Sequence, residues 1–197
     1  MTWRPTAGAI FSSRRVSELP LLIALAVSLV AASASAEPEW SSSIIPGAII
    51  HGAGSSWNTS FYGAVRGDAL FFRTNRHAFG FGPALEVGTS GFSDVRLLGS
   101  AEFLAPIGEF LAVSVAPGVT VRSSSVGAVP GLSGRAFFGM RAYGYTDYSL
   151  NAGLVLGFDH DLGGPREHAI VVGAQIDGLV LALPVLFLVS LFHGSGS

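Results

Sequence analysis

The chain has 197 residues, of which 12% are charged, and its net charge is −2 with arginine as its only basic residue apart from histidine. An average soluble domain has about twice this charged fraction. Low charge with a mean hydropathy of +0.53 excludes a disordered chain, the near-neutral balance argues against nucleic-acid binding, and the lack of cysteine excludes disulfides and thiolate sites.

The first 36 residues have the pattern of a secretory signal peptide. Three arginines form a positive N-terminal region, the apolar stretch 19–32 follows, and Ala34 and Ala36 give the small-residue cleavage pattern. The apolar stretch is shorter than the about 20 residues of a transmembrane helix, which argues against an uncleaved anchor. We therefore expect an exported chain that is cleaved near Ala36, with residues 37–197 as its one domain.

Residues 37–197 alternate repeatedly between apolar residues and small or polar ones, which is the period of a β-strand. Eight such segments are predicted. The length of each is close to that of a tilted membrane strand, which needs about 9–11 residues. They are 47–55, 61–73, 78–88, 94–105, 110–122, 132–143, 149–159 and 170–177. The sequence predicts an all-β fold, a single antiparallel up-and-down transmembrane barrel of about eight strands.

The connections between the predicted strands alternate in length. Short ones are expected at 74–76, 106–108 and 146–147, and longer polar ones at 54–60, 89–93, 123–130 and 160–167. Short turns at one end and longer loops at the other are typical of outer-membrane barrels.

Charge placement predicts which face of the strands points inward. One face carries aliphatic residues and phenylalanine, whereas the opposite face is mostly Gly, Ala, Ser and Thr with isolated charges. Those charges are four arginines and four carboxylates: Arg66, Arg96, Arg135, Arg141, Asp68, Glu86, Glu102 and Asp177. A balanced set suits a narrow lumen, since unpaired buried charges are costly. The sequence predicts a salt-bridged lumen network and a lipid-facing apolar surface; a diffusive pore is disfavoured because porins have about 16–18 strands.

On this alternation and charge balance, the chain resembles the small eight-stranded outer-membrane barrels of the OmpA and OmpX type over roughly Ser43–Leu181. The resemblance implies location in the bacterial outer membrane and a structural or interaction role in the cell envelope. It also implies contact with outer-membrane lipids and lipopolysaccharide, and insertion by the barrel-assembly machinery. No cofactor is expected, and the resemblance leaves any protein partner open.

The C-terminal region departs from this family. Such barrels commonly end on an aromatic residue that the assembly machinery recognises, whereas this chain continues from Phe192 to Ser197. The apolar run 178–192, with Pro184 inside, also loses the alternation. A prolonged last strand, an extra lipid-facing segment and a short buried helix all stay open for this run.

The richest polar cluster flanks the loop 162–166. It consists of Asp159, His160, Asp161, Glu167 and His168. A hairpin would bring the two ends of the loop together, and these oxygen and imidazole ligands could then meet a divalent cation that bridges lipopolysaccharide phosphates. No ligand spacing of a known site is present, so an ordinary hydrated loop without metal is favoured.

Two other functions compete with a structural barrel. Strand closure would bring His168 near Ser55 and Ser56, with Asp159 or Asp161 one strand away, and these are residue types that an outer-membrane lipid-A-modifying hydrolase would use. No catalytic signature accompanies them, so the sequence predicts a protein that is not an enzyme. A soluble secreted β-barrel that binds an apolar ligand would reverse the two faces, with an apolar lumen and a polar exterior.

Overall fold

The computed structural model describes residues 38–53, 56–124, 127–143, 148–163 and 168–180. The chain divides into two units, Met1–Ala36 and Glu37–Ser197. The predicted signal peptide and most of the run 178–192 lie outside the described residues. In the part of the chain that is described, no helix is long and apolar enough to cross a membrane.

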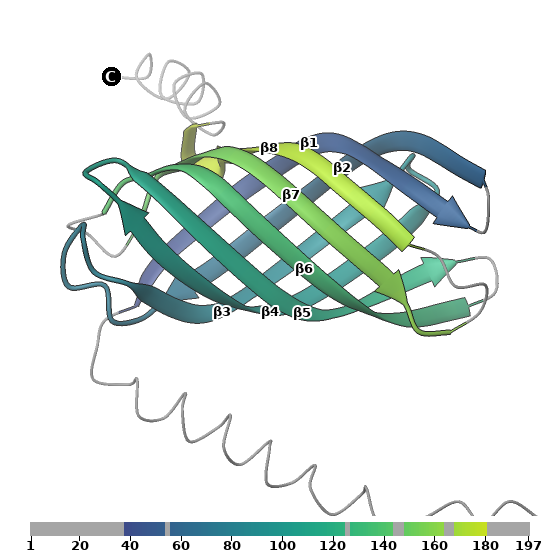
Figure 1. The fold of residues 1–197 in the computed structure, drawn as a ribbon, viewed down its shortest axis with the longest axis horizontal. Coiled ribbons are helices and arrows are strands. Elements are labelled where there is room, and N and C mark those ends of the chain that lie inside the picture. Colours follow the sequence, from purple (N-terminus) through teal and green to yellow (C-terminus); the bar gives the residue numbers. More distant parts are fainter. Residues whose placement is uncertain (1–37, 54–55, 125–126, 144–147, 164–167, 181–197) are drawn as a thin grey trace, which may run out of the picture. The chain divides into compact units, whose positions relative to one another are not determined.

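Eight antiparallel strands form a closed barrel in which neighbours in sequence are neighbours in the sheet (Figure 1). They are β1 (Glu39–Ala53), β2 (Ser56–Leu70), β3 (Gly80–Ser90), β4 (Asp94–Ile107), β5 (Leu111–Ser124), β6 (Gly127–Arg141), β7 (Asn151–Asp161) and β8 (His168–Asp177). Closure comes from β1, which pairs with β2 on one side and with β8 on the other. The predicted all-β, up-and-down barrel of eight strands is confirmed.

The first strand begins earlier than predicted, at Glu39 rather than Gly47. Its first residues pair with β2 but extend beyond the end of β8, because the β1–β8 ladder stops where Ser43 meets Asp177. The β6–β7 connection covers this overhang: Trp40 bridges to Tyr148, and the Ser149 amide donates to the Trp40 carbonyl at 2.8 Å.

The predicted asymmetry of the connections is wrong. Residues 54–60 and 123–130 belong mostly to strands. Only residues 54–55 lie between β1 and β2, and only residues 125–126 lie between β5 and β6. The longest connections, 71–79 and 142–150, are at the opposite end, where short turns were expected. The cause is that backbone ladders continue through polar residues, whereas the apolar alternation marks only the central part of each strand.

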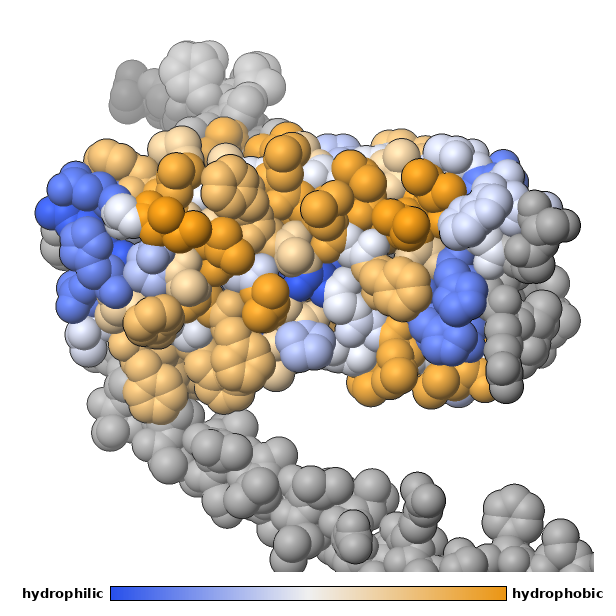
Figure 2. All heavy atoms as spheres, viewed as in Figure 1, coloured by the Kyte–Doolittle hydropathy of each residue, from blue (hydrophilic) through white to orange (hydrophobic). Residues whose placement is uncertain are grey.

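The two faces of the strands carry the side chains that the alternation predicts. Along the middle of β7, Leu154 and Leu156 point outward and are 62% and 58% exposed. Charged side chains on the other face are buried, with Arg66 at 4% and Glu86 at 1%. Figure 2 shows the result as a broad apolar band on the barrel wall with hydrophilic residues gathered toward the two ends.

Part of the interior is apolar, which the sequence did not predict. Inward side chains of β1, β2, β6, β7 and β8 form a buried cluster of Ile45, Ile49, Tyr62, Ala64, Phe137, Val155, Ala169 and Val171. A smaller cluster of Leu70, Leu104 and Ala112 lies inside β2, β4 and β5. The lumen is therefore filled by an apolar core on one side and by charged side chains on the other.

Gly82 is required by close approach of the backbone between β2 and β3. A Cβ atom there would lie 1.7 Å from the Ala69 carbonyl oxygen, whereas one at Gly99 would meet nothing within 4 Å. We expect Gly82→Ala to lower the free energy of unfolding by about 1–3 kcal/mol, as other overpacked sites do. Denaturant titration of the refolded barrel measures this. Gly99→Ala is the matched control, expected within about 0.5 kcal/mol of the wild type, and equal losses in the two variants would contradict the steric explanation.

Candidate functional site

The predicted lumen charges meet inside the barrel, and Arg135 is at their centre. From β6 it donates to Glu86 of β3 (Nη2 to Oε1, 2.9 Å) and to Asp159 of β7 (Nη1 to Oδ1, 2.7 Å). Arg96 of β4 also donates to Asp159, from the other side. Since β3 and β4 are separated from β6 and β7 along the sheet, these bonds connect opposite walls of the barrel.

Further arginines and carboxylates pair in turn, from Glu86 toward the end of the barrel where β1 begins. Arg66 reaches Glu86 at 3.4 Å and Glu102 at 2.8 Å. Arg141 then pairs with Glu102 at 3.5 Å and with Asp68. We call this connected set, from Arg96 to Asp68, the lumen ladder: Arg96, Asp159, Arg135, Glu86, Arg66, Glu102, Arg141 and Asp68. All of its side chains are buried.

The ladder ends in charges that the sequence did not assign to it. Glu39 accepts from Arg73 at 2.5 Å and lies 3.9 Å from the Arg141 Nε atom. The Arg73 guanidinium also lies 5.5 Å from the centre of the Tyr143 ring. Glu39 was missed because it precedes the predicted first strand, and Arg73 because it follows the inward run of β2.

A second group lies at the other end, where Arg122 pairs with Asp161 at 2.6 Å and with Asp94 at 3.7 Å. Arg122 and Asp94 are on the inward face that the alternation predicts. Asp161 was assigned to a loop because the predicted strand ends at Asp159. In the structure, β7 continues two residues further, to Asp161. Strand length is therefore the signal that was misread.

Asp177 differs from the other seven predicted lumen charges. Its carboxylate accepts from the Tyr148 hydroxyl at 3.1 Å, the Asn151 amide at 3.2 Å and the Leu179 amide at 2.8 Å. Residues 178–180 are helical, so β8 does not continue past Asp177 and the alternative of a prolonged last strand is excluded. Asp177 thus caps this turn and fastens β7 to the end of β8.

The structure separates the polar cluster around the loop 162–166 into two groups. Asp159 and Asp161 are buried in the lumen on arginine partners. His160 and His168 are on the outer face, with ring centroids 4.6 Å apart, and Glu167 lies outside the described residues. Within the described ranges no three His, Asp or Glu side chains are grouped to hold a metal ion.

The same separation disrupts the residue set of the hydrolase alternative. His168 is on the outer face of β8, whereas both candidate acids, Asp159 and Asp161, point into the lumen. Ser56 is exposed at the start of β2, and Ser55 lies outside the described residues. The barrel wall therefore stands between the base and the acid that such a mechanism would need to bring together.

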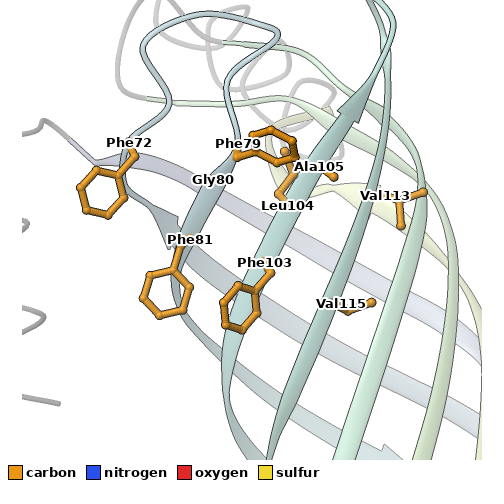
Figure 3. Close-up of a pocket in the computed structure, with 9 residues that line it drawn as sticks. All are labelled: Phe72, Phe79, Gly80, Phe81, Phe103, Leu104, Ala105, Val113 and Val115. Atoms are coloured by element: carbon orange, nitrogen blue, oxygen red, sulfur yellow. The ribbon is translucent and has the colours of Figure 1, made fainter. Parts of the chain in front are cut away.

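The outer wall is hollowed where β3, β4 and β5 meet the end nearest the β2–β3 connection (Figure 3). This hollow of about 310 Å³ is lined by Phe72, Phe79, Gly80, Phe81, Phe103, Leu104, Ala105, Val113 and Val115. The rings of Phe81 and Phe103 stand side by side on neighbouring strands, with centroids 4.7 Å apart. Such a surface offers apolar contact and no functional group for chemistry.

Comparison with solved structures finds chains with a similar fold. The chain is similar to Ail, the attachment invasion locus protein of Yersinia pestis, whose crystal structure was solved in complex with the heparin analogue sucrose octasulfate. The TM-score is 0.43 at 12% sequence identity, over 72% of this chain and 99% of that one. No family model and no curated protein matches the chain. The barrel itself is established by the pairing of β1 with β8.

Proposed function

We propose that this protein is an integral outer-membrane β-barrel with a closed, salt-bridged lumen and a structural or interaction role in the cell envelope. The observation that carries the proposal is the inverted placement of polarity. Large apolar side chains such as Leu154 and Val119, both 62% exposed, cover the outside, while the lumen ladder is buried within. A water-facing wall of this kind would be an aggregation surface, whereas hydrocarbon solvates it.

The interior supports a structural role over transport. Eight-stranded barrels are only wide enough for their own side chains to fill. Here the ladder connects β2, β3, β4, β6 and β7 across the interior, and the apolar cluster occupies the side near β1 and β8. A soluble barrel that binds an apolar ligand needs the opposite arrangement, an apolar cavity within a polar wall.

The surroundings in the envelope follow from this proposal. The leader 1–36 would direct export and be removed near Ala36, and the barrel-assembly machinery would insert residues 37–197. Outer-membrane lipids would contact the apolar wall, including the hollow beside Phe81 and Phe103. Lipopolysaccharide would meet the polar residues beyond the apolar band. The resemblance to the OmpA and OmpX type supports this assignment at the level of sequence pattern.

Membrane fractionation combined with gel mobility tests the proposal. We expect the protein in the outer-membrane fraction, and we expect its mobility in detergent gels to change on boiling because the closed barrel resists unfolding in detergent. A chain that is recovered in the soluble fraction, with one mobility before and after boiling, would contradict the membrane assignment.

A further inference from the structure

Two histidines form a pair on the outer face of the β7–β8 hairpin. His160 and His168 are directly opposite each other in the register of the two strands. Their ring centroids are 4.6 Å apart and their planes differ by 13°, so the two imidazoles lie face to face. His168 is exposed and His160 is half-buried. These rings are therefore held side by side by the backbone pairing of the hairpin.

The neighbours of the pair are apolar. Leu132 of β6 flanks His160, and the Phe158 ring lies 6.0 Å from the His168 ring. On the β1 side, His168 is opposite Gly52, and the Trp57 ring lies over Gly52: a Cβ atom there would be 2.8 Å from the ring atom Cζ3. Of the acids close to the pair in sequence, Asp159 and Asp161 point into the lumen on arginine partners, and Glu167 lies outside the described residues.

One nitrogen of the pair makes no hydrogen bond to the part of the chain that the structure describes. The Nδ1 atom of His160 is buried, and it makes no hydrogen bond within the described residues. A buried polar atom without a partner is costly. Coordination of an ion is one way to satisfy a nitrogen that carries a free lone pair.

We propose that His160 and His168 form a two-imidazole site for a divalent transition-metal ion, Cu²⁺, Ni²⁺ or Zn²⁺. Imidazole nitrogen suits these ions, whereas Ca²⁺ and Mg²⁺ require oxygen ligands. Metal–nitrogen bonds of about 2.0–2.1 Å place two ligating nitrogens within about 4.2 Å of each other. The lone pairs lie in the ring planes, so the face-to-face rings turn about χ1 and χ2 to aim one nitrogen of each at a common ion, and water completes the coordination. The bound ion would join β7 to β8 next to the loop that connects them.

Titration of the refolded barrel in detergent micelles with Cu²⁺ alone tests the proposal. Trp57 of β2 is separated from His168 of β8 only by Gly52 of β1, so bound Cu²⁺ is expected to quench its fluorescence, with saturation at one ion per chain. Calorimetric titration with Ni²⁺ and Zn²⁺ gives a second readout that does not depend on tryptophan. Ca²⁺ and Mg²⁺ at the same concentrations are expected to have no effect, and equal binding of these ions would overturn the assignment to imidazole.

His160→Ala and His168→Ala are each expected to weaken binding by about tenfold or more, corresponding to about 1.4 kcal/mol. His168→Gln keeps a polar side chain of similar size and is expected to weaken binding to the same degree. His77→Ala, an exposed histidine of the β2–β3 connection, is the matched control and should bind as the wild type does. Trp57→Phe should lose the quenching and keep the calorimetric signal. Wild-type affinity in His160→Ala or in a correctly folded His168→Gln variant would overturn the proposal, as would an equal loss in His77→Ala.

Discussion

Replacing Arg135 with alanine is expected to lower the free energy of unfolding by about 3–5 kcal/mol, the usual cost of removing one partner from a buried ionic network. Its guanidinium holds both Glu86 and Asp159, and its own side chain is only 3% exposed. The alanine variant leaves these carboxylates with fewer donors in an interior that water does not reach freely. Urea titration of the refolded barrel, followed by tryptophan fluorescence or by gel mobility, measures the loss.

Arg76→Ala is the matched control for a loop arginine. Arg76 pairs with Glu109 at 3.3 Å, but the two side chains are 51% and 61% exposed. Exposed pairs contribute about 0–1 kcal/mol because water and salt screen them. Arg141→Ala, which removes the partner of Asp68 and Glu102, should resemble Arg135→Ala. Equal unfolding midpoints for the lumen and loop variants would refute a stabilising ladder.

A double-mutant cycle separates the ion pair from simple packing. If the bond from Arg135 to Asp159 carries the effect, the double variant of Arg135→Ala with Asp159→Asn will lose less than the two single losses together. Contacting residues in one network typically couple by about 0.5–3 kcal/mol. Strict additivity would show that the bond to Asp159 does not carry the effect, which would then rest on the pairing with Glu86 and on packing of the methylene stem.

The number of strands and the identity of their two faces were predictable because both follow from a period of two. A residue such as Val115 alternates with Ser114 and Ala116, so its outward position is encoded locally. The same rule predicted that eight charges face inward, and the structure places seven of them in the ladder. Local pattern is sufficient wherever one face is apolar and the other is small or charged.

Strand ends and the apolar interior were not predictable by the same rule. At Ile44 and Ile45, at Ile49 and Ile50, and across the segment 170–172, neighbouring residues are all apolar, so alternation disappears where both faces are apolar. Inward positions such as Ile45 and Val171 were therefore left out of the predicted interior. The strand ends at the polar hairpins were not predicted for the opposite reason: neither face of the strand carries apolar residues there, so no alternation is visible.

Partner choice across the lumen depends on the closed geometry. That Arg96 of β4 meets Asp159 of β7 follows from the tilt and stagger of all eight strands, not from the spacing of the two residues in sequence. Alternation within the predicted strand 149–159 puts Asp159 on the inward face, but its ligand-like neighbours His160 and Asp161 led to its assignment to a loop cluster. Extension of β7 to Asp161 turns the two acids inward and the histidine outward.

An arginine in place of Leu156 tests the outer face directly. Leu156 lies at the middle of β7, points outward and is 58% exposed. If bilayer hydrocarbon covers this face, Leu156→Arg will lower the free energy of unfolding in phospholipid vesicles by about 2–4 kcal/mol, the cost of arginine near the bilayer midplane. Denaturant titration of the barrel folded into vesicles gives the value.

The control is Leu162→Arg, because Leu162 follows the end of β7 directly and is 56% exposed, nearly the same fraction as Leu156. Near the interface the cost of arginine falls to about 0–1 kcal/mol. The two leucines are matched in residue type and exposure, so a difference in the side chain lost or in its burial does not separate them. A large cost at Leu156 and a small one at Leu162 would therefore measure depth in the bilayer. Small and equal costs at both positions would mean that water covers this face, and the apolar band would then need another partner.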